Sequence, residues 1–453
     1  MMMSLMKMNE YVAIQEKICE KNDYIAPRLY DEYGVNRGLR DDRGVGVLTG
    51  LTNISKIVSS KVQDGKKVPC DGELWYRGYR VENLIGSLGE DELGFEKVAY
   101  LLLMGELPNA EEQHEFEKII GGLRTLPSNF TRDVIMKAPT EDIMNSMTRS
   151  ILTLASYDKN AKDTSVNNSL RQCIQLISEF PMLAVYGYNA YNHYVKNDSM
   201  FIHRPAKNLS TAENILMLLR PDKKYSKVEA KVLDTALILH MEHGGGNNST
   251  FTTRVVTSSG SDTYSTMAAA MSSLKGPKHG GANIKVINMF HHLKEAIKDW
   301  GNVTELDTYL KRMLNKEAYD KTGLIYGIGH AVYTLSDPRA VELKRLAGEL
   351  AKEKGREDEY NFLKLIEQEG IKCLQEHRGG SKPACANLDF YSGFIYEMIG
   401  LPQEIYTPIF AMARIVGWTA HRIEELNFEG RRIIRPAYKN ILGELEYKLL
   451  NER

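Results

Sequence analysis

The sequence has few cysteines, no long apolar run and almost no excess of either charge. Its five cysteines are scattered and include no CxxC pair: Cys19, Cys70, Cys173, Cys373 and Cys385. A disulfide framework or a zinc module needs regular, close cysteine spacing, so free thiols in a reducing compartment are expected. No stretch approaches the roughly 18 consecutive apolar residues of a membrane span, and the N-terminal segment lacks the apolar centre of a signal peptide. These absences predict a cytoplasmic protein without a membrane partner.

Net charge and chain length limit the class of protein and the number of domains. Lys and Arg total 58 against 59 Asp and Glu, which leaves a formal net charge of -1. Nucleic-acid-binding domains usually carry a basic excess, so no nucleic-acid partner is expected. The 453 residues are 43% hydrophobic and can bury a large core, and a chain of this length is typical of roughly two or three domains.

Strong strand signals are confined to one region near the N-terminus. Two Asp-Gly pairs, Asp64-Gly65 and Asp71-Gly72, interrupt runs rich in β-branched and aromatic residues. This pattern indicates hairpins, and therefore a small antiparallel sheet at about 53–80. Beyond about residue 90 the apolar residues recur at helical spacing, with Gly and Pro between successive helices. Because strands do not alternate with helices, a parallel α/β sheet is disfavoured.

The helical part of the chain is expected to form two domains. Residues 284–390 contain closely spaced helical segments that suggest a compact block inserted in a larger domain. The predicted fold class is mostly α. It has a large helical domain at 1–283 and 391–453, a smaller inserted helical domain at 284–390, and the small antiparallel β region near the N-terminus.

One histidine lies on a constrained turn in the segment LKGPKHGGAN, residues 274–283. Pro277 ends one helix, and Gly280-Gly281 allow a sharp turn directly after His279. At the start of the next helix the positive end of the helix dipole favours a neutral imidazole. Such a ring can donate a hydrogen bond to a carbonyl oxygen and stabilise an enolate, so His279 is a candidate catalytic residue. The alternative is a structural histidine in a tight turn.

The segment YGIGHAVYTLSDPRA, residues 326–340, combines a second histidine with an arginine. Two glycines before His330 let the backbone approach a ligand, although no preceding strand or third glycine completes a dinucleotide fingerprint. The pair Asp337-Pro338 is typical of a helix start and places Arg339 in the first turn. There Arg339 can bind a carboxylate through two hydrogen bonds, or it is a solvated first-turn residue.

A third segment, CANLDFYSGF at 385–394, surrounds one carboxylate with apolar side chains. Asp389 is either a helix cap or a base whose pKa is raised by its apolar surroundings.

A fourth segment, LILHMEHGGGNNSTFTTR at 237–254, carries His240 and His243. Their spacing permits metal ligation, but the helix must break at the following glycines and the pattern is not HExxH. A hydrogen bond from His243 to a substrate is the favoured interpretation.

Together, these segments resemble the citrate synthase family. GPKHGGAN, GIGHAV followed by DPR, and LDFYSG occur in the order and at the separations usual in that family, after a glycine-rich HGGG…ST segment. The stretch GLRDDRGVGVLTGLTNIS…GELWYRGYRVENLI is similar to the family's small β region, so the likeness runs from about residue 38 to the end. One departure is Gly244, where many members have Glu; here Glu242 precedes His243 instead.

The resemblance implies an acyltransferase that condenses acetyl-CoA with oxaloacetate and hydrolyses citryl-CoA to citrate and CoA. Asp389 would take the proton from the acetyl methyl group, and His279 would hold the thioester oxygen as the enolate forms. His330 would hydrogen-bond the ketone of oxaloacetate and protonate the new alkoxide. Neither a metal ion nor a cofactor is implied, because acetyl-CoA is a substrate.

The resemblance also implies how the anionic substrates are held. Oxaloacetate is a dianion and needs fixed cations; by likeness these are Arg339, Arg414 and Arg435, with His243 as a further contact. In the family the arginine that matches Arg435 reaches into the partner subunit's site, which implies a homo-oligomer, at least a dimer.

Contacts with CoA are implied for one backbone segment and one basic side chain: Gly327, Ile328, Gly329 and Lys382. The 284–390 domain is expected to close over oxaloacetate before acetyl-CoA binds, because enolate chemistry must be shielded from water. Scattering profiles that superimpose with and without oxaloacetate would contradict this closure.

Several alternatives stay open. A 2-methylcitrate synthase, which uses propionyl-CoA, would carry the same motifs because one methylene in an apolar pocket changes binding by only roughly 1–3 kcal/mol. A citryl-CoA-cleaving enzyme would keep similar motifs, although no nucleotide-binding segment supports a cleaving partner. A non-catalytic helical scaffold would not need His279, His330 and Asp389 together, and an NAD-dependent oxidoreductase would need a strand–glycine–helix unit that is missing.

Overall fold

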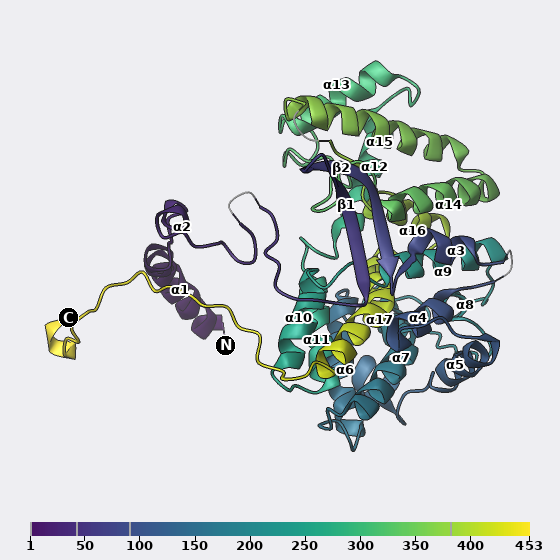
Figure 1. Ribbon diagram of the computed structural model, residues 1–453, viewed down its shortest axis with the longest axis horizontal. Coiled ribbons are helices and arrows are strands. Elements are labelled where there is room, and N and C mark those ends of the chain that lie inside the picture. The colour runs from purple at the N-terminus through teal and green to yellow at the C-terminus, as the bar shows by residue number, and fades with distance from the viewer. Residues whose placement is uncertain (1, 42–43, 90–91, 381–382) are drawn as a thin grey trace. The chain divides into compact units, whose positions relative to one another are not determined.

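The computed structural model describes residues 2–41, 44–89, 92–380 and 383–453, with side chains from residue 7 onward. The chain forms two units, residues 1–51 and residues 52–453. The first unit contains the helices α1 (Met2–Asn22) and α2 (Arg28–Glu32). The second unit holds the three-stranded sheet, the other helices and every predicted site residue that the structure describes (Figure 1).

The predicted antiparallel sheet is present in the second unit. Strands β1 (Ser55–Gln63), β2 (Lys66–Tyr76) and β3 (Tyr79–Arg80) are antiparallel and lie in the order β1-β2-β3. Asp64 and Gly65 form the β1–β2 turn with φ of 51° and 73°, the left-handed conformations that a two-residue hairpin turn requires. This part of the sequence-based prediction is confirmed.

The second Asp-Gly pair does not form a turn. Asp71 and Gly72 lie inside β2, and the turn to β3 is made by Arg77 and Gly78 instead. Gly72 is required for a different reason: a Cβ atom there would lie 2.3 Å from the carbonyl oxygen of Ser336. The glycine of this Asp-Gly pair is therefore needed for close packing against a distant segment of backbone, and not for a turn.

Helices make up most of the second unit. They are α3 (Val81–Gly86), α4 (Phe95–Met104), α5 (Ala110–Gly122), α6 (Ile143–Leu154), α7 (Val166–Tyr194), α8 (Thr211–Leu219), α9 (Lys227–His240), α10 (Asn248–Ser258), α11 (Thr263–Leu274), α12 (Ala282–Ala296), α13 (Val303–Leu314), α14 (Pro338–Lys354), α15 (Glu357–His377), α16 (Asp389–Met398) and α17 (Tyr406–Leu426). Together with the small sheet, they confirm the predicted mostly α fold class.

Local capping signals begin several of these helices. Asn109, Ser210 and Ser226 each accept a hydrogen bond from the backbone of a glutamate three residues later, whose side chain bonds back to the cap backbone. These capping boxes satisfy backbone donors that the first turn of a helix leaves unpaired. The predicted Asp337-Pro338 start of α14 is also present, with the Asp337 carboxylate accepting the backbone N–H of Arg339.

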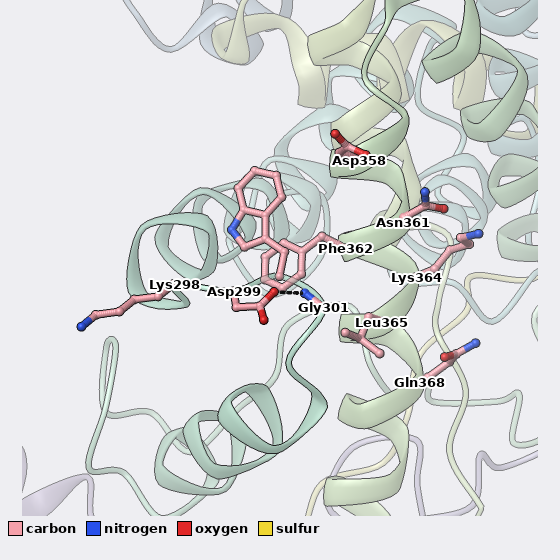
Figure 2. A pocket seen from close by; sticks show the side chains of 10 residues that line it. Lys298, Asp299, Gly301, Asp358, Asn361, Phe362, Lys364, Leu365 and Gln368 are labelled. Carbon is pink, nitrogen blue, oxygen red and sulfur yellow. Dashed lines mark hydrogen bonds between the residues drawn. The ribbon is translucent and has the colours of Figure 1, made fainter.

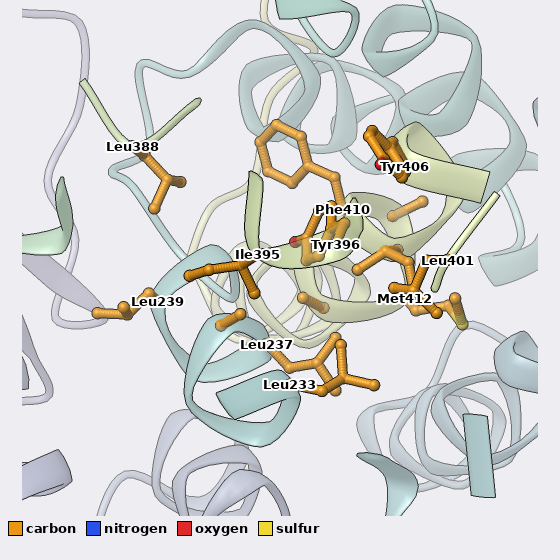
Figure 3. Close-up of a cluster of buried hydrophobic side chains, with 14 of the residues drawn as sticks. Leu233, Leu237, Leu239, Leu388, Ile395, Tyr396, Leu401, Tyr406, Phe410 and Met412 are labelled. Carbon is orange, nitrogen blue, oxygen red and sulfur yellow. The ribbon is translucent and has the colours of Figure 1, made fainter. Parts of the chain in front are cut away.

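Helix α17 is the centre of the core and is buried on almost every face. It packs against α4, α7, α9, α10 and α11, and Figure 3 shows apolar side chains of α9, α16 and α17 meeting in one cluster. Gly417 permits the contact with the segment after α9, because a Cβ there would lie 2.3 Å from the carbonyl oxygen of Met241. Most of its buried side chains are apolar, and the buried Arg414, His421 and Arg422 are exceptions with hydrogen-bond partners.

The predicted 284–390 domain covers α12 to α15, of which α13 and α14 pack on α15, and α12 and α14 pack on α16. The division into residues 1–51 and 52–453 does not test that boundary, and it stays a prediction. In the described part of the chain, no helix is both long and apolar enough to cross a membrane.

Candidate active site

Two segments distant in sequence are joined just before His330 and Asp389. The backbone N–H of Gly329 donates to Cys385 at 2.7 Å, and the N–H of Asn387 donates to Gly327 at 2.9 Å. Gly327 and Gly329 have positive φ angles of 81° and 100°, respectively, a conformation that residues with a side chain rarely adopt. The short bridge therefore holds the start of the His330 loop against the start of α16.

The backbone around His330 determines which ring nitrogen carries the proton. Its Nδ1 accepts hydrogen bonds from the N–H groups of Val332 at 2.9 Å and Tyr333 at 3.0 Å. Since Nδ1 accepts, the proton of the neutral ring lies on Nε2. Burial, followed by the charge of Arg339, lowers the pKa of His330 to about 4. His330 is thus a neutral hydrogen-bond donor at pH 7.

Arg339 is buried in a two-point ion pair within its own helix start. Its Nε and Nη2 donate to the two carboxylate oxygens of Asp337 at 3.0 and 2.8 Å. Against the effect of burial, Asp337 raises the pKa of Arg339 above its usual value. Nη2 also lies 3.4 Å from Nε2 of His330, so two groups that can donate hydrogen bonds face one another. A ligand oxygen between them would accept from both.

Arg414 carries a buried guanidinium that is only partly hydrogen-bonded. Its Nε donates to the carbonyl oxygen of His240 at 2.6 Å, whereas Nη1 is buried without a partner among the described residues. The guanidinium carbon lies 4.7 Å from the ring centroid of Phe410. Burial lowers the pKa of Arg414 to about 10, which leaves it charged at pH 7. A buried cation with an unused donor favours an anionic ligand.

His243 is buried directly beside His330. The two ring centroids are 5.3 Å apart, and the ring of Tyr333 lies 5.5 Å from His243 and 4.9 Å from His330. Nε2 of His243 has no hydrogen-bond partner in the described part of the chain. Burial, with Arg339 as the next cause, lowers the pKa of His243 well below its ordinary value. Its free nitrogen is available to a ligand, and the predicted contact with a substrate stays a prediction.

Asp389 begins α16 but does not cap it. Leu388 occupies the cap position, and no hydrogen bond to the Asp389 carboxylate is found within the described residues. Burial raises the pKa of this carboxyl to about 6, while the nearby cations Arg339 and Arg414 oppose the rise. Of the two interpretations of the sequence, the geometry favours a base over a cap.

His279 lies on the turn between α11 and α12, where the glycines predicted it. Its Nε2 is 3.0 Å from Oγ of Ser249, and the indole N–H of Trp418 donates to the same oxygen at 3.1 Å. Burial, and then Arg414, lowers the pKa of His279 to about 4, so its ring is neutral. The sequence placed Ser249 in a glycine-rich segment but held no signal that linked it to His279.

His240, considered above as a metal ligand with His243, has a different environment. Its Nδ1 donates to the carbonyl oxygen of Ala236 at 2.6 Å, and its ring lies 4.9 Å from that of Phe410. Burial lowers its pKa to about 3. Across the residues that the structure describes, no three His, Cys, Asp or Glu side chains gather as metal ligands.

The structure does not bring Arg435 to the site of its own chain. Arg435 is exposed on the segment after α17, and the N–H of Ile434 donates to Oγ of Ser258 at 3.0 Å. Ser258 is the last residue of α10, whereas Ser249, which contacts His279, lies in its first turn. The nine residues between them correspond to roughly 13 Å along the helix axis.

The predicted CoA contacts are only partly described. Lys382 lies outside the described residues. Gly327 and Gly329 use backbone groups to bind residues 385–387, and Ile328 forms a bridge with Ala386. A contact between this segment and CoA stays a prediction.

A surface groove lies elsewhere, between α15 and the loop before α13 (Figure 2). Trp300 stacks on Phe362 there with ring centroids 5.1 Å apart. None of the predicted site residues lines it.

Comparisons with known proteins agree with this geometry. A family model described as citrate synthase, C-terminal domain, matches residues 43–437. A citrate synthase of Synechocystis sp. is 34% identical, over 81% of this chain and 84% of its own length. The chain belongs to the citrate synthase family. It is accordingly an acyltransferase of the citrate synthase type, and the sequence-based resemblance is confirmed.

Other members of the family share the fold but differ in the reaction that their names give. A citrate synthase from Thermoplasma acidophilum, solved as a ternary complex with carboxymethyl coenzyme A and oxaloacetate, is 29% identical with a TM-score of 0.74, covering 90% of this chain and 97% of its own. A 2-methylcitrate synthase of Corynebacterium glutamicum is 31% identical, over 86% of this chain and 92% of its own length. Family membership therefore gives the type of condensation but not the acyl group.

Proposed function

We propose that this enzyme condenses acetyl-CoA with oxaloacetate and hydrolyses the resulting citryl-CoA to citrate and CoA. The observation that carries the proposal is the pair of buried guanidinium groups, Arg339 and Arg414, beside neutral His243 and His330. Two fixed cations with neutral donors suit a small dicarboxylate that also has a ketone.

The oxaloacetate site follows from these donors. The two carboxylates bind Arg339 and Arg414, with Nε2 of His243 as a further contact. The N–H at Nε2 of His330 points to the ketone oxygen, since Nδ1 is occupied by backbone donors. This hydrogen bond makes the ketone carbon more electrophilic.

Proton transfer at the thioester is assigned to Asp389 and His279. Asp389 removes a proton from the methyl group of acetyl-CoA, and His279 stabilises the enolate oxygen through a hydrogen bond from its neutral imidazole ring.

Condensation and hydrolysis complete the sequence. The enolate carbon attacks the ketone carbon of oxaloacetate, and His330 gives its Nε2 proton to the new alkoxide. The methyl proton held by Asp389 replaces, by way of solvent, the proton that His330 gave up. Water then cleaves the thioester C–S bond: its hydroxyl joins the acyl carbon, one proton goes to the CoA thiolate, and the remaining acid proton is released as citrate forms.

The test is to measure CoA release from acetyl-CoA and from propionyl-CoA with oxaloacetate. We expect kcat/KM for acetyl-CoA to be about 10-fold or more higher, because one methylene in an apolar pocket is worth roughly 1–3 kcal/mol. Absence of CoA release with both thioesters would refute the synthase assignment and leave the scaffold alternative.

A 2-methylcitrate synthase is the second candidate, because similarity to known relatives supports it equally well. Relatives with that activity are as similar to this chain as several citrate synthases are, at 31% against 32% identity. A clear preference for propionyl-CoA in the same assay would select this branch.

We also propose that the active form is at least a dimer, in which Arg435 binds oxaloacetate in the partner's site. The exposure of Arg435, and the attachment of its segment to the end of α10 remote from Ser249, support an action in trans. Arg435→Ala and Asp389→Asn chains are each expected to be inactive alone. Refolded together, they are expected to regain activity, because one site of each mixed dimer has both intact residues. Mixtures that stay inactive would contradict a shared site.

A further inference from the structure

The β1–β2 hairpin contacts both segments that carry the candidate oxaloacetate ligands. In Figure 1 the two strands extend from the region of α17 towards that of α14, and β2 packs against α14. At one end of β2, the hydroxyl of Tyr76 donates to the carbonyl oxygens of Ile238 and Glu242, each at 3.1 Å. The hairpin is thus hydrogen-bonded to the chain segment directly before His243.

The Glu242 side chain strengthens this attachment. Its Oε1 accepts from Oγ of Ser55 in β1 at 2.9 Å, from the N–H of Gly244, and from Nε2 of His421 in α17 at 3.0 Å. Although burial opposes it, the contact with His421 lowers the pKa of Glu242 to about 2. An anionic Glu242 therefore ties the residues on both sides of His243 to β1 and to α17.

The middle of β2 contacts the loop that carries His330. The N–H of Gly72 donates to Oγ of Ser336 at 3.1 Å, and that hydroxyl donates to the Asp71 carboxylate at 3.0 Å. The Tyr333 hydroxyl lies 3.4 Å from the carbonyl oxygen of Glu73. Only a glycine fits at position 72, because a Cβ there would lie 2.3 Å from the Ser336 carbonyl oxygen and 2.6 Å from the Tyr333 ring.

We propose that the β1–β2 hairpin is a positioning element that holds the 330–337 loop at a fixed distance from His243 and thereby sets the affinity for the 2-oxo dicarboxylate. Ser336 and Gly72 are its positioning residues on this loop. Arg339 follows the loop directly, and His330 begins it, so a shift of the loop separates both from His243 and Arg414. The affinity part of this inference rests on the proposed function.

Ser336→Ala and Gly72→Ala test the inference, with Gly122→Ala as the matched control. Gly122 lies in α5 with open space around its Cα and an ordinary φ. Calorimetry with oxaloacetate is expected to show about fivefold to tenfold weaker binding for Ser336→Ala, because two hydrogen bonds between loop and hairpin are lost. Gly72→Ala is expected to weaken binding at least as much, and Gly122→Ala to leave it unchanged.

Steady-state kinetics distinguish positioning from general damage to the fold. The KM for oxaloacetate is expected to rise in both hairpin variants, while the KM for the thioester and the thermal midpoint of Ser336→Ala stay at the wild-type values. Wild-type affinity in both variants would overturn the inference. If Gly72→Ala does not fold, the oxaloacetate affinity of Ser336→Ala by itself tests the inference.

Hydrogen–deuterium exchange separates failure of this inference from failure of the proposed function. Peptides that cover 330–337 are expected to exchange faster in Ser336→Ala than in wild type or Gly122→Ala, whatever reaction the enzyme catalyses. Unchanged exchange would show that the hairpin does not order the loop. Absence of CoA release in the wild type would instead refute the proposed function. The role of the hairpin would then still be tested by the exchange measurement.

Discussion

Replacement of Asp389 by asparagine is expected to lower kcat by roughly 1,000-fold, since a positioned general base contributes about 10²–10⁴ in rate. Asparagine has nearly the same volume and cannot take the methyl proton. The Asp389 carboxylate has no hydrogen-bond partner among the described residues, so its loss strands no other group. Calorimetric binding of oxaloacetate and the thermal midpoint are therefore expected to change little.

The matched control is Asp358→Asn. Asp358 is exposed in the first turn of α15, so the same chemical exchange there should leave kcat at the wild-type value. Near-normal activity of the Asp389→Asn protein would remove Asp389 as the base.

The pKa of Asp389 also determines the acid limb of the pH profile. The base must be deprotonated to act, and burial raises its pKa from 3.8 to about 6. We therefore expect kcat/KM for the thioester to fall as the pH drops below about 6. His279 and His330, with pKa values of about 4, stay neutral over that range. A profile that is flat down to pH 5 would contradict this assignment.

Arg339→Met is expected to produce the second large effect, on both binding and stability. The KM for oxaloacetate should rise roughly 100-fold, because hydrogen bonds to charged groups contribute about 1.5–3 kcal/mol each. The free energy of unfolding should fall by about 3–5 kcal/mol, because Asp337 keeps a buried charge without its partner. Both side chains of this pair are almost fully buried, 5% and 0% exposed.

A double variant separates the two effects. Adding Asp337→Asn to Arg339→Met removes the stranded charge and keeps an amide oxygen that can cap α14. Chemical denaturation is expected to show that most of the lost stability returns. Oxaloacetate binding is expected to stay weak, since no cation has been restored. Recovery of binding in the double variant would refute Arg339 as a substrate ligand.

Short-range signals predicted the local structure well. The Asp64-Gly65 turn, the Asp337-Pro338 helix start and the turn that holds His279 all depend on backbone preferences of neighbouring residues. The same rules were wrong for Asp71-Gly72, which lies inside β2. There the glycine is required by Ser336, 264 residues away, and no local preference records such a contact.

Partners of the candidate catalytic groups were the part that sequence could not supply. The hydrogen bond between Ser249 and His279 and the pairing of residues 327–329 with 385–387 join positions far apart along the chain. The unused donor of Arg414 likewise depends on what surrounds it in the folded chain. Periodicity assigns a residue to a helix or a turn, but it does not say which turn packs against which.

By itself, the sequence determined the mostly helical class, the single β region and the three short segments around His279, His330 and Asp389. These follow from spacing and from the conformational limits of glycine and proline, which act over a few residues. Tertiary structure alone decided that Asp389 is a half-buried carboxylate with no hydrogen-bond partner among the described residues, and that the ring proton of His330 lies on Nε2. Both depend on burial and on long-range hydrogen bonds, because a pKa and a tautomer are properties of the surroundings that folding assembles.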